Sequence, residues 1–308
     1  MKEESCSYRQ CLKYGEETLA AAGIEEAGND AWMLFSEIFQ MSRVKYYMDM
    51  NRPCDPQQMT AYEEWISLRA DRIPLQQIIG RAPFMGYEFD VDEHVLIPRQ
   101  DTEILVEQTF EQIKKADVQR NRSVVRKTET DIPKQILKIL DMCTGSGCIA
   151  ISLACMAEEA GIPCEITAVD LSEEALKVAE KNNRKLCRGS VKLIQSNLFA
   201  ALPETLEFDI IVSNPPYIKS GEIEGLMPEV RDHEPRMALD GTEDGLCFYR
   251  KLAEDGRKFL KPGGQMLLEI GYDQGTSVPS ILRQWGYVQC RVVRDLAGLD
   301  RVVAAVRV

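Results

Sequence analysis

The sequence predicts an α/β protein in which a doubly wound, mostly parallel β-sheet follows a small helical domain. Three patterns support this fold class. Beyond residue 99, short β-rich runs alternate with helical patterns, which is typical of a sheet covered by helices. Before residue 74, apolar and aromatic residues recur at helical spacing. The chain then finishes with two β-rich runs joined by a short connection, which predicts a hairpin at one edge of the sheet.

Residues 1–73 are predicted to form the helical domain. Pro74 cannot continue a helix and stops the last one. A bundle core explains the spacing of the large side chains, and the outer face of the bundle is a candidate docking surface for a protein substrate. Capping signals predict three helices: Cys11 to Ala22 ending at Gly23, a second starting at Asn29-Asp30, and a third from Asp55-Pro56 to Arg69.

Residues 74–98 alternate apolar and polar side chains around glycines, which predicts a β-hairpin linking the helical domain to a sheet domain at 99–308. The final hairpin adds two strands to the five that are predicted to be parallel, so the predicted sheet has seven strands. The predicted strands lie near 136–142, 164–169, 190–196, 208–214 and 264–270, with the hairpin at Val288 to Arg294 and Arg301 to Val308.

The most informative motif is Asn214-Pro215-Pro216-Tyr217, at the end of an apolar strand. Prolines lack an N–H group and fix φ, so the free carbonyl groups of this turn only accept hydrogen bonds. The side-chain oxygen of Asn214 and the carbonyl oxygen of Pro215 can take the two N–H groups of an amide or an exocyclic amine, while Tyr217 stacks on the flat face. This predicts a site that orients a weak nitrogen nucleophile. The alternatives are an ordinary strand-ending turn and a proline-rich ligand.

A glycine-rich turn joins the first predicted parallel strand to a helical pattern. Gly145 and Gly147 allow a tight bend and a close approach of the backbone to a ligand. The next strand ends at Asp170, whose carboxylate can accept both ribose hydroxyls of a nucleoside. The alternative role is a helix N-cap, for which Ser172 is the better candidate. The third strand leads to Asn197-Leu198, which would face an adenine ring.

These motifs are part of a longer pattern. The second half of the sequence resembles class I S-adenosylmethionine-dependent methyltransferases, and the whole chain resembles the peptide chain release factor glutamine methyltransferases (the HemK/PrmC family). The stretches Leu96-Ile97-Pro98-Arg99 and 234–246 are more specific than the glycine turn, which any class I methyltransferase could share. The resemblance covers residues 74–80, 84–89, 95–103, 141–147, 170, 214–217, 234–241 and 244–246.

The resemblance implies a seven-stranded class I methyltransferase (Rossmann-like) sheet that binds S-adenosylmethionine. It implies methyl transfer to the side-chain amide nitrogen of the glutamine in the Gly-Gly-Gln motif of bacterial peptide chain release factors. The implied catalytic residues are Asn214, Pro215 and Tyr217, and together with Pro216 they bind the substrate. The implied cofactor-binding residues are Cys143, Thr144, Gly145, Ser146, Gly147, Asp170, Asn197, Leu198 and Asn214.

The sequence departs from the family pattern at three places. Cys143 stands where the family usually has glycine, and Asn197 stands where it usually has an acid. The segment 116–134 is longer than the usual link into the first strand. Because both substituted side chains are small and Asn197 keeps an acceptor, we expect cofactor binding to survive.

Composition favours a protein substrate over a nucleic acid. The net charge of −12 argues against a nucleic-acid-binding surface. The alternative function, an adenine or guanine amino methyltransferase, would require a basic groove. The basic run at 114–138 is expected to be a mobile solvated loop, with weak contact to ribosomal RNA or an acidic protein as the alternative. A catalytically silent cofactor-binding scaffold is a third possibility, against which the intact turn at 214–217 argues.

The sequence also predicts a cytoplasmic protein with no metal and no membrane segment. The N-terminus lacks the apolar core of a signal peptide, and the sequence has no run of about 18 apolar residues. Ten cysteines are dispersed without a Cys-x-x-Cys pair, which indicates reduced thiols. Two histidines argue against a zinc site.

Overall fold

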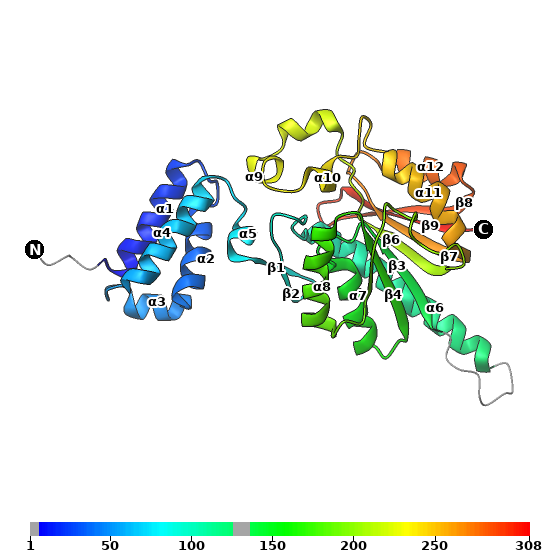
Figure 1. Ribbon diagram of the computed structural model, residues 1–308, viewed down its shortest axis with the longest axis horizontal. Coiled ribbons are helices and arrows are strands. Elements are labelled where there is room, and N and C mark those ends of the chain that lie inside the picture. Colours follow the sequence, from blue (N-terminus) through cyan, green and yellow to red (C-terminus); the bar gives the residue numbers. More distant parts are fainter. Residues whose placement is uncertain (1–5, 126–135) are drawn as a thin grey trace, which may run out of the picture. The chain divides into compact units, whose positions relative to one another are not determined.

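The computed structural model describes residues 6–125 and 136–308 and divides into two compact units (Figure 1). The first unit contains the chain up to Arg81 together with Met227–His233, and the second contains Ala82–Leu226 and Glu234–Val308. The helical unit is therefore discontinuous in sequence. The predicted domain limits, 1–73, 74–98 and 99–308, stay predictions.

The helical unit is built from capped helices. Ser7 forms a capping box with Gln10, and the side chains of Ser42 and Asp55 cap two further helices. The helix cap predicted at Asp55 is thus confirmed. The helices are α1 (Tyr8–Ala21), α2 (Ala27–Phe39), α3 (Arg43–Asp49), α4 (Pro56–Ala70), α5 (Leu75–Ile79) and, from the distant segment, α9 (Pro228–Arg231).

Two sequence predictions for this unit are wrong. The second helix starts at Ala27 rather than at Asn29-Asp30, because the Asp30 carboxylate does not cap the helix but pairs with Arg69 (Nε to Oδ2, 2.8 Å). The short helices α3 and α5 were not expected, and part of the segment predicted as hairpin is α5. Each is too short to give a periodic apolar pattern.

A buried ion cluster joins the distant segment to this unit. Arg69 contacts the Asp30 carboxylate and, through Nη2, Glu229 Oε1 at 3.0 Å, and Arg72 Nη1 reaches the same oxygen at 3.2 Å. Burial raises the pKa of Glu229, but hydrogen bonds from the backbone and from both arginines outweigh this and hold it below the ordinary value. The segment is thereby fixed by charge to α4.

The second unit contains the predicted seven-stranded sheet, which is confirmed. The strand order is β5-β4-β3-β6-β7-β9-β8; the first five strands in this order are parallel, and β9 is antiparallel to both of its neighbours. The strands are β3 (Leu137–Met142), β4 (Cys164–Asp170), β5 (Lys192–Gln195), β6 (Phe208–Ser213), β7 (Leu260–Glu269), β8 (Tyr287–Arg294) and β9 (Asp300–Arg307).

Helices cover both faces of this sheet. Along β6, Ile210 and Val212 enter one core and Ile211 enters the other, as the alternation of strand side chains requires. The first core is closed by Leu105 of α6 and Leu153 of α7. The second core is closed by α11 and α12. The helices of this unit are α6 (Gln100–Val125), α7 (Cys148–Glu159), α8 (Glu173–Cys187), α10 (Arg236–Leu239), α11 (Cys247–Phe259) and α12 (Ser277–Gln284), with a 3-10 turn at Ser220–Gly225.

A small hairpin of β1 (Arg81–Phe84) and β2 (Tyr87–Asp90) precedes the sheet. Its two-residue turn has positive φ at both Met85 and Gly86, the geometry that matches the twist of paired strands. Glu103 accepts the Met85 N–H at 2.6 Å, which compensates the strained residue. Asn182 of α8 exchanges two hydrogen bonds with the backbone of Asp90 and so holds the hairpin on the second unit.

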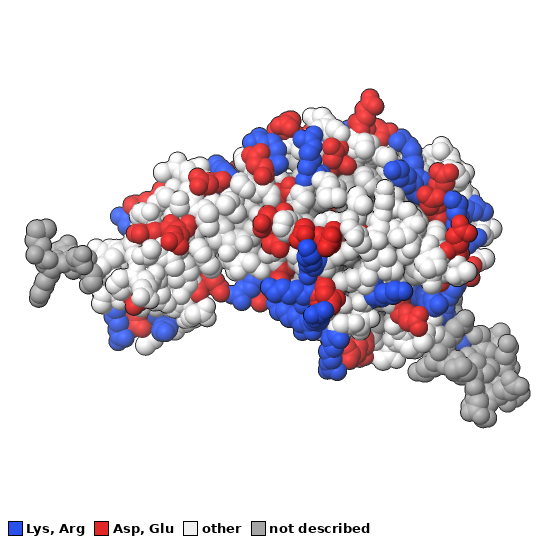
Figure 2. Space-filling model, in the orientation of Figure 1, with Lys and Arg blue, Asp and Glu red and all other residues white. Residues whose placement is uncertain are grey.

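The prediction of a loop throughout the basic run is wrong for residues 114–125, because α6 continues to Val125. Arg120 pairs there with Asp209 at 2.5 Å. Residues 126–135 lie outside the described residues, and the run ends in β3 with Leu137 and Lys138. On the face in Figure 2, basic side chains lie beside acidic ones. No helix in the described part of the chain has both the length and the apolar character needed to cross a bilayer.

Candidate active site

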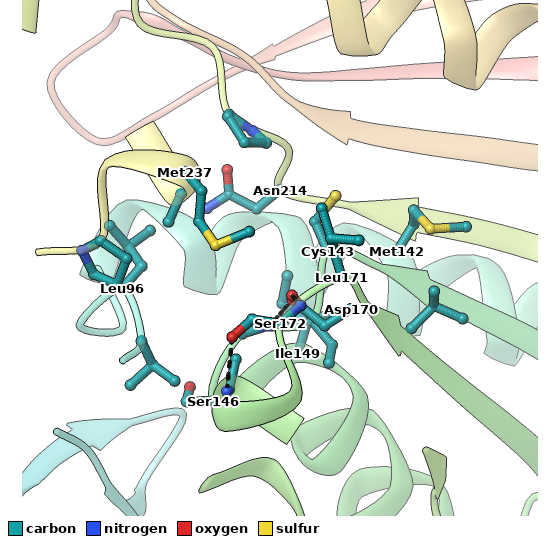
Figure 3. Close-up of a pocket in the computed structure, with 18 of the residues that line it drawn as sticks. Leu96, Met142, Cys143, Ser146, Ile149, Asp170, Leu171, Ser172, Asn214 and Met237 are labelled. Carbon is teal, nitrogen blue, oxygen red and sulfur yellow. Dashed lines mark hydrogen bonds between the residues drawn. The ribbon is translucent and has the colours of Figure 1, made fainter. Parts of the chain in front are cut away.

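The site lies at β3, where the order in which successive strands are added to the sheet reverses. β4 and β5 lie on one side of β3, and β6 and β7 lie on the other. In open α/β sheets, the carboxyl ends of the strands flanking such a switch point form a ligand crevice. Cys143 follows β3 and Asn214 follows β6 at this point. A cavity of about 360 Å³ lies there, with Asn214 and Met237 facing Asp170 and Ser172 across it (Figure 3).

The glycine turn uses its glycines for different purposes. Gly145 has φ +54°, and a Cβ built on it would meet open space at the cavity wall. Gly147 has φ +82°, does not line the cavity, and a Cβ there would lie 2.7 Å from the Ile151 side chain. Gly145 therefore permits close approach of a ligand, whereas Gly147 permits close packing of α7.

A buried carboxyl group, that of Asp141, holds this turn by hydrogen bonds. Asp141, at the end of β3, accepts the Thr144 hydroxyl at 2.6 Å and the Ala150 N–H at 3.3 Å, both through Oδ2. Its other oxygen has no partner among the described residues. Burial raises the pKa of Asp141 to about 7. Burying this carboxyl group costs free energy, and its hydrogen bonds attach the glycine turn to β3.

Asp170 holds the turn from the other side. One carboxylate oxygen accepts the Gly145 N–H at 2.8 Å and the other accepts the Ser172 N–H at 2.9 Å. Burial raises the pKa of Asp170 despite these backbone hydrogen bonds. Ser172 caps α8 by accepting the Ala175 N–H at 3.1 Å, so the preference for Ser172 as the cap is confirmed. Asp170 lines the cavity, and each of its oxygens can accept one more hydrogen bond.

The loop after β5 supplies another wall of the cavity. Leu198 is buried and adopts φ +51°, whereas Asn197 is exposed, and both line the cavity. An apolar side chain held inward next to an exposed amide suits a flat heteroaromatic ring with polar edges.

The turn at 214–217 presents only part of itself to the cavity. Asn214 and Pro216 line the wall, but Pro215 and Tyr217 do not. The Asn214 amide donates from Nδ2 to the Thr102 hydroxyl oxygen at 3.3 Å. The Tyr217 hydroxyl donates to Glu269 Oε1 at 3.5 Å, and burial raises the pKa of this phenol. The described contacts of Asn214 thus leave its carbonyl oxygen available to a ligand.

The end of this turn is packed tightly. A Cβ on Gly241 would lie 2.7 Å from the Tyr217 Cα, and one on Gly245 would lie 2.4 Å from the Tyr217 carbonyl oxygen. The buried Gln274 donates from Nε2 to that same oxygen at 3.2 Å. The turn is therefore fixed by backbone contacts that only glycine allows.

Comparisons with known proteins show the family of the chain. Residues 10–80 match the PrmC N-terminal domain and residues 133–284 match a methyltransferase domain. The release factor glutamine methyltransferase of Geobacter sulfurreducens is 35% identical over 98% of this chain and 97% of its own. That of Clostridium acetobutylicum is 37% identical over 90% of each. The chain belongs to the release factor glutamine methyltransferase family.

The fold also resembles the solved structure of a methyltransferase from Pyrococcus furiosus, which is 20% identical and has a TM-score of 0.49 over 78% of this chain and 98% of that one.

Members of this family are S-adenosylmethionine-dependent enzymes, and the cavity fits that cofactor. The Ser146 hydroxyl is buried at the cavity wall and has no partner among the described residues. The open space beside Gly145 would be filled by a Cβ. The Asp170 carboxylate adds a hydrogen-bond acceptor and Leu198 adds an apolar cover, which suits a nucleoside that carries a polar chain. The structure thus holds acceptors and room where the cofactor needs them.

Several cavity residues were not predicted. The stretches 95–103 and 234–241 are typical of the family, but the sequence indicates no role for them. Apart from the start of α6 and the short helix α10, these stretches are loops without helical or strand periodicity, and their Pro-Arg composition is the only signal. The unpredicted residues include His94, Leu96, Pro98, Arg99, Thr102, Met142, Ser172, Ser196, Pro235, Met237, Ala238, Asp240, Thr242 and Phe248.

Potential metal ligands gather at one place in the described part of the chain. Ligand atoms of Asp92, Glu93 and His94 lie within 4.8 Å of one another in a partly exposed loop. Adjacent exposed acids have this arrangement without an ion, so the absence of a metal stays a prediction.

Proposed function

We propose that the chain transfers a methyl group from S-adenosylmethionine to the side-chain amide nitrogen of the glutamine in the Gly-Gly-Gln motif of bacterial peptide chain release factors. The observation that carries the proposal is the Asn214 amide, whose nitrogen is committed to Thr102 while its oxygen stays available at the cavity wall. The relatives named above are release factor glutamine methyltransferases, and their names support a glutamine of a release factor as the substrate.

The proposed reaction depends on orientation. An amide nitrogen is a poor nucleophile because its lone pair is delocalised into the carbonyl group. Asn214 Oδ1 and the Pro215 carbonyl oxygen would accept the two N–H groups of the target glutamine and turn its nitrogen toward the reacting methyl group. Positioning of this kind contributes up to ~7–11 kcal/mol in favourable cases. Tyr217 is proposed to support the turn rather than to form a cavity wall.

The charge that develops also favours carbonyl acceptors. When bound, the cofactor supplies an electrophilic methyl group on a sulfonium. The acceptors at Asn214 and Pro215 stabilise the positive charge that appears on the amide nitrogen. None of the four turn residues is a general base, so we propose that the released proton passes to water.

The cofactor contacts follow from the cavity wall. Asp170 would accept the ribose hydroxyls, and Asn197 and Leu198 would hold the adenine. The turn from Cys143 to Gly147 would border the methionine part, with Gly145 and the Ser146 hydroxyl closest to it. Gly147 would act through packing of the turn, because it does not line the cavity.

We also propose that residues 1–73 dock the release factor. The helix α3 exposes Tyr47 at 66% and Met48 at 80% of their surfaces, an unusual exposure for large apolar side chains. Replacing both with serine should raise the KM for whole release factor several-fold and leave cofactor affinity unchanged. An unchanged KM would exclude this helix from docking.

The ten cysteines are free thiols in the structure, which is consistent with the proposed cytoplasmic location and its reducing conditions. Fractionation of cells followed by immunodetection would test the location, and recovery in a membrane or extracytoplasmic fraction would contradict it.

The decisive experiment is mass spectrometry of purified release factor after incubation with the enzyme and methyl-labelled cofactor. The proposal expects one added methyl group on the glutamine of the Gly-Gly-Gln peptide. A release factor with that glutamine replaced by asparagine is the matched substrate control. Asn214→Ala is the matched enzyme control and should lower turnover roughly 100-fold if positioning dominates. Unmodified release factor with active, cofactor-bound enzyme would refute the proposed substrate.

A further inference from the structure

A buried glutamine outside the cavity connects the Asn-Pro-Pro-Tyr turn to three other segments. Gln274 lies between β7 and α12, is 5% exposed and does not line the cavity. Its Nε2 donates to the carbonyl oxygens of Tyr217 and Gly245, each at 3.2 Å. Its Oε1 accepts the Gly271 N–H at 2.9 Å and the Tyr249 hydroxyl at 3.2 Å. All five residues belong to the second unit.

The partners of this amide leave it a single orientation. A glutamine amide has two N–H hydrogens and one carbonyl oxygen. Two of the partners are carbonyl oxygens, which can only accept, and a third is a backbone N–H, which can only donate. The nitrogen of Gln274 must therefore face Tyr217 and Gly245, and the flipped amide is excluded. Both N–H hydrogens are thus committed to backbone oxygens, and losing either contact would leave a buried polar group unpaired.

The turn depends on donors from other segments because of its two prolines. They have no N–H group, and their rings restrict φ to about −65°. At the start of the turn, Ser213 is held by pairing with Met142 and by its hydroxyl, which donates to the Met142 carbonyl oxygen at 2.6 Å. At its end, Gln274 holds the Tyr217 carbonyl. With both ends held and two φ angles restricted, little freedom remains in the direction of the Pro215 carbonyl.

The second donation from Gln274 reaches a wall of the cavity. Gly245 belongs to the loop that carries the cavity residue Asp240. This loop lies along the chain that follows the turn, because the Gly241 N–H donates to the Ile218 carbonyl oxygen at 2.8 Å. One buried amide therefore fixes the turn and the neighbouring loop relative to each other.

We propose that Gln274 is a positioning residue that, through Tyr217, holds the Pro215 carbonyl oxygen and Asn214 in place for the incoming glutamine. The inference rests on the proposed function, in which Asn214 Oδ1 and the Pro215 carbonyl oxygen accept the two N–H groups of the substrate. Methyl transfer to a weak nucleophile depends on close orientation, so a small displacement of these acceptors lowers the rate constant.

The first test is the kcat of variants with saturating cofactor and release factor. Gln274→Met has a similar size and removes both donations, so kcat should fall roughly 10–100-fold. None of the proposed cofactor contacts is held by Gln274, so the Kd for the cofactor should stay within about twofold. Gln274→Glu keeps the acceptor for Gly271 but has at most one hydrogen to donate, so its kcat should also fall. This closer variant provides the test if Gln274→Met does not fold.

A second buried glutamine provides the matched control. Gln112 of α6 is also 5% exposed, and its Oε1 accepts a hydrogen bond from Gln265 at 3.1 Å, away from the cavity. Gln112→Met should lower the thermal unfolding temperature, as Gln274→Met does, but should leave kcat within about twofold of the wild type. Equal kcat values in the two methionine variants, at a temperature where both are folded, would show that Gln274 is merely structural.

The second test needs no substrate. Tyr217-Ile218 is the only Tyr-Ile pair in the sequence, so protein labelled with 13C at tyrosine carbonyl carbons and 15N at isoleucine gives one correlated resonance from the peptide bond between them. The chemical shift of the Tyr217 carbonyl carbon should change in both Gln274 variants and not in Gln112→Met. If the wild type leaves release factor unmethylated, the proposed function is refuted, and this resonance alone decides whether Gln274 holds the turn. An unchanged resonance, or wild-type kcat in a folded Gln274 variant, would overturn the inference.

Discussion

Asp170 offers a quantitative test of the cofactor site. Its carboxylate accepts two backbone N–H groups, from Gly145 and Ser172, and lines the cavity. In Asp170→Ala, a bound ribose would lose a charged acceptor. Hydrogen bonds to charged groups contribute about 1.5–3 kcal/mol each. Since ~1.4 kcal/mol corresponds to a tenfold change in affinity, the loss of one such bond should raise the Kd for S-adenosylmethionine roughly 10–150-fold.

The same variant also loosens the glycine turn, and the two effects can be separated. Asp170→Asn has nearly the same shape and keeps one acceptor oxygen, so its Kd should lie between those of the wild type and Asp170→Ala. Isothermal titration calorimetry at neutral pH gives the Kd values. Thermal unfolding without cofactor shows whether each variant is folded. A folded Asp170→Ala protein that binds cofactor as tightly as the wild type would remove Asp170 from the cofactor site.

Three further predictions concern the turn, the helical unit and pH. Gly145→Ala should weaken cofactor binding, whereas Gly161→Ala, with a similar left-handed φ and open surroundings, should cost stability alone; equal Kd values in calorimetry would contradict this. Arg69→Met removes the partner of the buried Asp30 carboxylate and leaves Glu229 with Arg72 alone, so it should lower the free energy of urea unfolding by about 3–5 kcal/mol; a loss under about 1 kcal/mol would show that these ion pairs contribute little to stability. Burial raises the pKa of Asp141 from 3.8 to about 7, so the folded state retains a proton that the unfolded state releases, and the free energy of unfolding should fall as pH rises between these values. Asp141→Asn should reduce that fall, as measured by unfolding at several pH values. The same pH dependence in the variant as in the wild type would refute this prediction.

The sheet was predictable from the sequence because its strands carry their own signals. β3 and β6 are rich in apolar residues and are followed by turn residues, which is typical of buried parallel strands. The terminal hairpin and the capped starts of α4 and α8 were visible for the same local reasons. These elements are determined within a few residues of themselves, so a single sequence is enough to place them.

The walls of the cavity could not be predicted in the same way. Thr102 contacts Asn214 across 112 residues of sequence, and no local pattern records that contact. Gly145 and Gly147 look alike in the sequence, but one faces open space and the other a packed side chain. Asp is a residue type that often caps helices, and only the tertiary partner Arg69 explains why Asp30 lies inside α2 instead. Long-range contacts decide each of these cases.

The seven residues Met227–His233 have a consequence for how this protein can be divided. They belong to the helical unit, yet they are encoded between the Asn-Pro-Pro-Tyr turn and the cavity residues Pro235 and Met237. A fragment starting at Ala82 therefore still carries Glu229 but lacks Arg69 and Arg72, its partners. No single cut separates the two units, and a chimaera that exchanges the helical unit between relatives must exchange this internal stretch as well.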